Sequence, residues 1–168
     1  MSDLVCEPLS KQHDRQRFRC GVPELDTWLQ QRARQDQDRR VAAVYVMVPK
    51  SDPTRIVGFY TLSAMSIVLE SLPPALIRKL PRYPVVPSIL IGRLARDLDF
   101  PGTGGKLLAD ALQRALLHST NIAAATVVVD AKDETASEFY RHFGFEPLAG
   151  DSRRLFLAMD TLEKLFKK

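Results

Sequence analysis

The sequence predicts a mixed α/β fold in which one sheet is covered by helices on both sides. Apolar runs of strand length alternate with segments of helical periodicity, in the order helix, hairpin, strand, glycine-rich loop, helix, strand, helix, strand. No internal repeat or long linker interrupts this order. With 168 residues, of which 45% are hydrophobic and 26% charged, the chain suits a single domain spanning residues 1–168.

The first part of the chain is expected to form a helix and then a β-hairpin. Pro23 fits the first position of a helix, where its missing N–H costs nothing, and apolar residues follow it at helical spacing. Residues 41–48 form an uninterrupted apolar run, which is typical of a buried strand. A turn at 49–53, with a proline at each end, leads into a second strand at 56–63.

Prolines shape the segment after the hairpin. The Pro-Pro pair at 73–74 is expected to start a short helix that runs through Leu80. Pro81, Pro84 and Pro87 then predict an extended, irregular connection, because a residue that precedes a proline is disfavoured in helical geometry.

Strands and helices are expected to alternate in the second half. Residues 89–95 form an apolar strand, and the glycine-rich stretch 101–105 separates this strand from a helix that ends near His118. A buried strand at 126–130 follows.

One further helix and strand complete the fold. Asp133 is expected to cap the start of this helix, whose apolar face includes Tyr140, and Gly144 is expected to cap its end. A last strand at 154–159 and a basic amphipathic tail at 162–168 follow.

Composition excludes several classes of protein. The longest apolar run is far shorter than the roughly 20 residues that a membrane-spanning helix needs, and Met1–Leu4 do not begin a secretory signal. Cys6 and Cys20 lack the spacing of metal ligands, and the three histidines are scattered singly. We therefore expect a cytoplasmic protein with no bound metal and no membrane partner.

The segment from Ile89 to Lys106 gives the clearest chemical signal. A strand runs into a glycine-rich turn that opens a helix, so backbone N–H groups and the helix dipole favour an anion such as a pyrophosphate. Lys106 adds a charge in the first helical turn. A Walker A loop is excluded because Phe100 and Leu107 stand where it needs glycine and a hydroxyl. Leu107 also breaks the dinucleotide fingerprint, and a turn without a ligand is the alternative.

The net charge of +4 is modest, so the positions of the basic residues matter more than their number. Arg78, Lys79 and Arg82 form a cluster with no acidic residue among them, whereas other arginines are interleaved with aspartates. This cluster is the best candidate for contacts with a polyanion, and a plain solvated surface is the alternative.

Four segments together resemble known acetyltransferases. Residues 92–97, with the glycine-rich loop, resemble the acetyl-CoA-binding core of the GNAT family, and residues 130–145 resemble its C-terminal helix. Residues 18–29 and 58–63 are similar to a subgroup, the GNAT toxins of type II toxin–antitoxin systems, which acetylate the amino group of aminoacyl-tRNA. The resemblance covers residues 5–165. It implies the GNAT fold, with a mixed, mostly antiparallel central sheet flanked by helices.

The resemblance also implies a site. Tyr140 would protonate the thiolate that leaves during acetyl transfer, since a phenol stays protonated at neutral pH; core packing is its alternative role. The residues implied to bind acetyl-CoA are Leu94, Ala95, Arg96, Gly102, Thr103, Gly104, Gly105, Lys106 and Asp133. The residues implied to bind aminoacyl-tRNA are Arg78, Lys79, Arg82 and Arg93.

Membership of the subgroup would imply a protein that blocks translation. Its expected partners are aminoacyl-tRNA, a ribbon-helix-helix antitoxin, DNA through that antitoxin only, and a second copy in a homodimer. No carboxylate stands out as a general base; Asp97 and Asp99 are interpreted as loop residues, with orientation of the acceptor amine as the alternative. This favours an α-amine as acceptor, because its reference pKa of about 7.7–8.0 leaves much of it unprotonated at neutral pH.

Two other functions stay open. One is acetylation of a small amine or of a protein N-terminus. The other is a catalytically weak binding module, because Pro101 stands where the family has a basic or amide residue and removes an N–H donor from a loop shorter than the family pattern.

Overall fold

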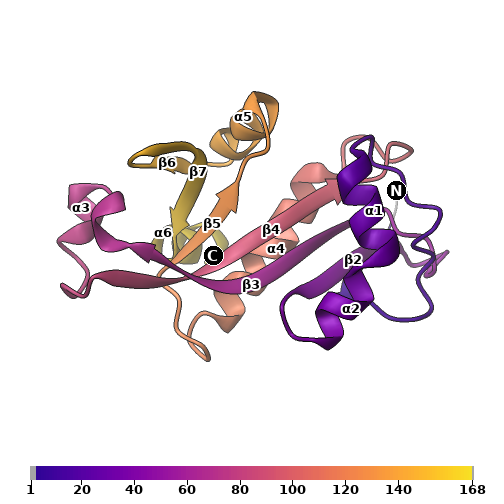
Figure 1. Cartoon of the computed structure of the whole chain (residues 1–168), viewed down its shortest axis with the longest axis horizontal. Coiled ribbons are helices and arrows are strands. Elements are labelled where there is room, and N and C mark those ends of the chain that lie inside the picture. The colour runs from indigo at the N-terminus through magenta and orange to yellow at the C-terminus, as the bar shows by residue number, and fades with distance from the viewer. Residues whose placement is uncertain (1–2, 168) are drawn as a thin grey trace. The chain divides into compact units, whose positions relative to one another are not determined.

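The computed structural model describes residues 3–167, apart from the side chains of residues 151 and 152, and shows a mixed α/β protein (Figure 1). Its strands are β1 (Leu4–Pro8), β2 (Ala43–Pro49), β3 (Gly58–Val68), β4 (Val85–Arg96), β5 (Thr126–Asp130), β6 (Glu146–Leu148) and β7 (Asp151–Ala158). Its helices are α1 (Pro23–Gln31), α2 (Ala33–Asp38), α3 (Pro74–Ile77), α4 (Gly104–His118), α5 (Glu134–His142) and α6 (Met159–Phe166), with a 3₁₀ turn at Leu69–Ser71.

Within the described residues the strands form one seven-stranded sheet in the order β1-β2-β3-β4-β5-β7-β6. β4 and β5 are parallel, whereas β1–β2, β2–β3, β5–β7 and β6–β7 are antiparallel pairs. The predicted fold class, a mixed and mostly antiparallel sheet with helices, is confirmed. The chain divides into two compact units, an N-terminal unit of residues 1–63 and 92–111 and a C-terminal unit of residues 64–91 and 112–168.

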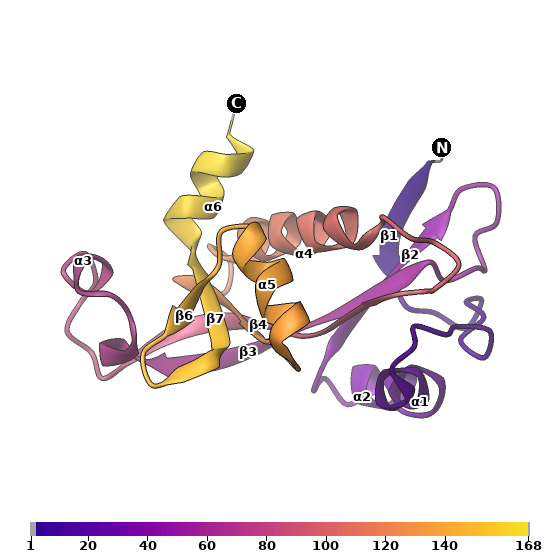
Figure 2. The same cartoon turned by 90° about the horizontal axis from the view of Figure 1, so that it is seen from above.

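In the N-terminal unit, helices pack on both faces of the sheet (Figure 2). Successive residues of β3 point to opposite sides, as the pleat of a strand requires. Phe59 faces Trp28 of α1, with ring centroids 5.8 Å apart, whereas the Gly58 side faces Leu107 of α4. Phe18 adds an edge-to-face contact to Phe59 at 5.4 Å. The helix that begins at Pro23 is therefore confirmed, and its apolar face closes this core.

The C-terminal unit has an apolar core of its own, with the β6–β7 hairpin following α5 (Figure 1). Its buried members are Ile67, Leu69, Leu72, Val86, Val128, Leu148 and Phe156. The hydroxyls of Ser88 in β4 and Thr126 in β5 are both buried, and they lie 2.7 Å apart in a mutual hydrogen bond. The bond satisfies two polar groups that would otherwise be costly to bury.

Local signals fix both ends of α5. The Asp133 carboxylate accepts a hydrogen bond from the N–H of Ala136 at 2.8 Å, which is the predicted N-cap. At the other end Gly144 takes φ +98°, and the N–H groups of Gly144 and Phe145 donate to the carbonyls of Arg141 and Tyr140. These two bonds form the Schellman pattern, so the predicted C-terminal cap is confirmed.

Two strands, β1 and β6, were not predicted from the sequence. β1 is an edge strand that pairs with β2, and its residues are only partly buried or exposed, so no apolar run marks it. β6 has three residues and only Leu148 is buried. Strands as short or as exposed as these carry little hydrophobic pattern.

The prediction that the irregular connection after α3 extends through Pro87 is wrong, because Pro87 lies inside β4. Pro87 precedes the first registered pair of β4 with β5, Ser88–Thr126, so its missing N–H costs little there, and its carbonyl still accepts from the N–H of Ala125. The strand predicted at 56–63 begins at Gly58 and continues to Val68, past the small polar residues that end its apolar run.

Helix ends differ in two places. α3 ends at Ile77 rather than Leu80, and single hydrogen-bonded turns continue to Leu80. The last strand ends at Ala158, and the amphipathic tail begins earlier than expected, as α6 from Met159. Lys168, the end of the predicted tail, lies outside the described residues.

Candidate active site

A buried ion pair holds the segment that joins β4 to the glycine-rich loop. The Asp97 side chain is 3% exposed and lies 3.3 Å from the guanidinium of Arg55, which also bonds Asp99 at 3.1 Å. The same carboxylate accepts hydrogen bonds from the N–H groups of Arg19, at 3.0 Å, and Asp99, at 2.9 Å. The Arg55 guanidinium also lies 5.1 Å from the ring centroid of Phe100. Asp97 and Asp99 are therefore structural residues of this loop, as the sequence analysis interpreted them.

Helix α4 begins directly in the glycine-rich loop. The N–H of Leu107 donates to the carbonyl of Thr103 at 3.0 Å, which makes Thr103 the residue before the first helical turn. The next three amides, 104–106, belong to the positions that have no acceptor within a helix. Gly102 takes φ +84°, a conformation that favours glycine, and turns the chain into the helix. This loop can therefore bind an anion through backbone N–H groups and the helix dipole.

Strand β4 continues beyond its pairing with β5. Within the described residues, the registered pairs of these two strands end at Ile91–Val129, whereas β4 runs on to Arg96. Residues 92–96 therefore extend past the β4–β5 ladder, and their backbone can hydrogen bond to an extended ligand. On the β3 side, a Cβ at Gly58 would lie 3.0 Å from the carbonyl oxygen of Ala95, so a side chain there would force β4 to shift.

Arg93 of β4 is held by residues from α1 and α2. Its guanidinium carbon lies 3.9 Å from the centroid of the Trp28 ring, and the indole N–H donates to Asp36 at 2.9 Å. Burial lowers the pKa of Arg93, and the charge of Asp36 opposes this shift. The N–H of Arg93 donates to the hydroxyl of Thr61 at 3.0 Å. Sequence reasoning missed Trp28 and Asp36, because nothing local connects them to Arg93.

The Phe18–Gly21 segment, one of the most specific elements of the sequence, builds the N-terminal core. Phe18 is fully buried, and the N–H of Cys20 donates to Asp26 of α1 at 2.9 Å. Gly21 has φ +90° beside the side chain of Leu98. Burial, followed by the nearby Asp26, raises the pKa of Cys20 to about 11, so Cys20 is a neutral thiol and not a nucleophile at neutral pH.

Tyr140 and Asp133 belong to the C-terminal unit. Tyr140 is 7% exposed and makes edge contacts with the rings of Phe139, at 5.3 Å, and Phe145, at 5.4 Å. Burial, and then the charge of Asp130, raises the pKa of Tyr140 to about 12. Its hydroxyl therefore stays protonated at neutral pH. Asp133 is engaged as the α5 N-cap, and its exposed carboxylate has a lowered pKa chiefly because of the Ala136 N–H.

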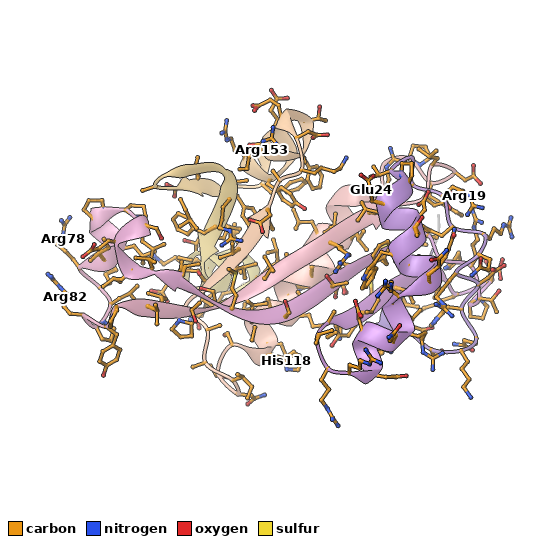
Figure 3. The ribbon with its side chains drawn as sticks, in the orientation of Figure 1. Arg19, Glu24, Arg78, Arg82, His118 and Arg153 are labelled. Carbon is orange, nitrogen blue, oxygen red and sulfur yellow. The ribbon has the colours of Figure 1, made fainter. Side chains whose placement is uncertain are left out.

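The basic cluster lies just after α3, also in the C-terminal unit. Arg78, Lys79 and Arg82 are exposed, and Figure 3 shows the side chains of Arg78 and Arg82 extending away from the ribbon. Tyr83, which the sequence analysis did not single out, is 69% exposed next to Arg82. Exposed cations beside an aromatic ring suit contacts with nucleic acid.

The structure divides the predicted site residues between the two units. The N-terminal unit brings together Arg93, Leu94, Ala95, Arg96, Gly102, Thr103, Gly104, Gly105 and Lys106. The C-terminal unit contains Arg78, Lys79, Arg82, Asp133 and Tyr140. Within residues 3–167, no three or more His, Cys, Asp and Glu side chains gather as a metal site would require. In the same part of the chain, no helix is long and apolar enough to cross a membrane.

Curated relatives match most of the chain, whereas no protein-family model matches it. A probable toxin TacT of Sinorhizobium fredii is 32% identical over 171 aligned positions, covering 96% of this chain and 94% of the relative. A tRNA-acetylating toxin of Mycobacterium tuberculosis is 33% identical over 150 positions, covering 88% of this chain and 87% of the relative.

Solved structures show the same fold bound to different molecules. AtaT complexed with acetyl-methionyl-tRNAfMet has a TM-score of 0.91 and 29% identity, covering 98% of this chain and 100% of that one. A mutant AtaT toxin bound to the C-terminus of the antitoxin AtaR and to acetyl-CoA has a TM-score of 0.83 and 26% identity, covering 99% of each chain. An AtaT–AtaR complex bound to DNA has a TM-score of 0.78 and 27% identity, covering 97% of this chain and 99% of that one.

Proposed function

Because this chain belongs to the GNAT acetyltransferase toxins of toxin–antitoxin systems, we propose that it transfers acetyl from acetyl-CoA to the α-amino group of aminoacyl-tRNA. The product, an N-blocked aminoacyl-tRNA, can no longer accept a growing peptide, so translation stops. One arrangement carries the proposal. β4 extends past its ladder with β5, and the glycine-rich loop that follows turns at Gly102 into the start of α4.

Acetyl-CoA is assigned to this loop and strand. The backbone N–H groups at 104–106 bind the pyrophosphate, and Gly102, Thr103 and Lys106 support that contact through the turn, the helix start and a positive charge. The backbone of Leu94, Ala95 and Arg96 aligns the pantetheine arm and polarises the thioester oxygen. Asp133 contributes by fixing the start of α5, the helix that carries Tyr140.

Chemistry requires that the acceptor nitrogen lose a proton and that the departing sulfur gain one. The amine attacks the thioester carbonyl carbon, the C–N bond forms, and the C–S bond breaks. Tyr140 donates its hydroxyl proton to the sulfur, and the proton released by the nitrogen returns to the phenol. The raised pKa of Tyr140 keeps this proton in place until the bond breaks.

Arg78, Lys79, Arg82 and Arg93 are assigned to the RNA. The first three are exposed cations that suit phosphates of the acceptor stem, and the fourth is held one residue before the strand segment assigned to the coenzyme. Such contacts give affinity that falls as salt rises.

We also propose that the protein binds an antitoxin and a second copy of itself. By analogy with AtaR, which binds AtaT and DNA, we expect an antitoxin that neutralises this protein and connects it to DNA, and we propose that it is of the ribbon-helix-helix type. We also propose that residues 1–168 form one catalytic domain, because β3, β4 and α4 each contribute to both units. We propose in addition that the protein is cytoplasmic and forms a homodimer. Sedimentation of the purified protein tests the dimer, and a monomer at micromolar concentration would contradict it.

The deciding experiment is acetyl transfer with radiolabelled acetyl-CoA and bulk charged tRNA. Label should appear in acid-precipitable RNA and disappear after mild alkaline deacylation, because the acetyl group is attached to the esterified amino acid. Label on uncharged tRNA, or no label at all, would contradict the proposal.

Controls separate the two remaining alternatives. Transfer to small amines or peptides but not to charged tRNA would indicate the small-amine or N-terminal enzyme. Failure to bind acetyl-CoA in calorimetry would indicate the binding module that the shortened loop and Pro101 suggested.

A further inference from the structure

Trp28 is fixed by three different contacts in the N-terminal unit. Its ring stacks on Phe59 with an interplanar angle of 18°, its N–H donates to Asp36 at 2.9 Å, and the guanidinium of Arg93 lies 3.9 Å from its centroid. The residue is 8% exposed. The indole therefore has little freedom to rotate, and it presents a fixed aromatic surface to Arg93.

Arg93 is constrained at both ends by this arrangement. Its backbone N–H donates to the Thr61 hydroxyl at 3.0 Å, and its guanidinium is stacked on Trp28. Because the Trp28 ring contacts the guanidinium at its central carbon, the N–H groups around that carbon can still donate to a phosphate. Asp36 lies near enough to favour the charged form of Arg93, although burial opposes it.

A purely structural role would not require an arginine at the position of Arg93. Partial burial of a guanidinium is costly, and an apolar side chain packed on Trp28 would usually stabilise a core as well or better. A stacked, partly desolvated arginine is instead suited to an anion, since desolvation strengthens its interaction with a phosphate.

From this geometry we infer that Trp28 and Asp36 are positioning residues, which hold Arg93 so that its N–H edge binds a phosphodiester group near the 3′ end of the tRNA. The inference rests on the proposed function. The 3′ end is favoured because Arg93 immediately precedes Leu94–Arg96, the segment assigned to the coenzyme beside which the reacting amine must lie.

The first test compares substitutions at Trp28. Trp28→Leu removes the aromatic surface and is expected to raise KM for aminoacyl-tRNA about 5- to 30-fold, the effect of one desolvated cation–π contact, with kcat nearly unchanged. Trp28→Phe keeps an aromatic surface and should restore most of the loss. Because Trp28 lies in the core, acetyl-CoA affinity and the thermal midpoint are measured on each variant. Equal KM for Trp28→Leu and wild type in a folded protein would overturn the inference.

The second test asks whether Trp28 acts through Arg93. Arg93→Gln should lower the slope of log Kd for uncharged tRNA against log salt by about 0.7 to 0.9, the value of one phosphate contact. If Trp28 only positions Arg93, the double variant Trp28→Leu/Arg93→Gln should bind no more weakly than Arg93→Gln alone. Additive losses, or an unchanged salt slope, would contradict the assignment.

Two controls complete the design. Arg17→Gln removes the same charge from an exposed position of the same unit and should leave the salt slope near that of wild type. Binding of uncharged tRNA does not depend on acetyl transfer, so the Arg93 result can be obtained whether or not the wild type acetylates charged tRNA. Loss of transfer with intact tRNA binding would therefore contradict the proposed function alone.

Discussion

Tyr140 lies among aromatic rings, and its phenol is harder to ionise than a tyrosine in water. Burial is the main cause and the charge of Asp130 adds to it, so the pKa rises from 10.0 to about 12. The acid form needed for catalysis is present at all pH values below that range and is lost only as pH rises through it.

The pH dependence of the reaction follows from this shift. We expect kcat/KM to rise with pH through the amine pKa, about 7.7–8.0 or lower for the esterified amino acid, and then to remain level up to about pH 9.5. The measurement is initial rates of acetyl transfer to charged tRNA across this range. A descending limb near neutral pH would mean that the catalytic acid is not Tyr140.

Tyr140→Phe tests the same role directly. The variant keeps the ring contacts to Phe139 and Phe145 but removes the proton, so kcat should fall about 100-fold or more, with acetyl-CoA affinity retained. Single-turnover rates and calorimetry provide the two readings. Normal turnover in a folded variant would assign Tyr140 to packing alone.

Cys20 is expected to react slowly with thiol reagents. Its pKa of about 11, against 9.0 for a free thiol, leaves about 100-fold less thiolate near pH 8. Alkylation followed by mass spectrometry should therefore modify Cys20 about 100-fold more slowly than glutathione under the same conditions. Rapid modification would show that the burial of Cys20, and with it the contact with Asp26, does not persist in solution.

At the scale of elements, the ends of α5 show how local sequence fixes a functional helix. Asp133→Ala should destabilise the protein, because it removes the N-cap acceptor for the Ala136 N–H. Urea unfolding measures this loss, and Asp133→Ser, which can still cap, should recover most of it. If Asp133 contacts acetyl-CoA as well, the Ser variant should recover stability without recovering affinity.

The turn before α4 depends in a similar way on one glycine. Nothing lies within 4 Å of a Cβ built on Gly102, so the cost of Gly102→Ala comes from its φ of +84° and not from a clash. We expect this variant to weaken acetyl-CoA binding several-fold, whereas Gly102→Asn should bind more tightly than it, because asparagine tolerates this conformation. Calorimetry measures the affinity of both variants for acetyl-CoA. Equal affinities would show that the loop is not part of the coenzyme site.

The features that the sequence predicted well are those with local causes. Pro23, Asp133 and Gly144 each mark a helix end through their own backbone chemistry. The edge strand β1 and the position of Pro87 inside β4 depend on the strands beside them, which the sequence does not place. The Trp28–Arg93 stack and the Arg55–Asp97 ion pair join distant segments, so neither leaves a spacing pattern.

At the scale of the whole molecule, the net charge of +4 is small and its effect depends on where the cations lie. Arg78→Gln and Arg82→Gln should each lower the salt slope of tRNA binding by about 0.7 to 0.9 if each contacts a phosphate. Filter binding between about 50 and 200 mM salt gives the slopes. Lys50→Gln, an exposed cation outside the cluster, is the control. Slopes that match the control would leave the cluster as a solvated surface.

The stack on Arg93 also gives the molecule a built-in optical reporter. Trp28 is the single tryptophan of the chain, so ultraviolet emission excited at the red edge comes from this one indole. An anion that draws the guanidinium away from the ring, or presses it closer, should change the intensity or wavelength of that emission. Mixing the protein with RNA in a stopped-flow fluorimeter would then time the arrival of the substrate without any attached dye.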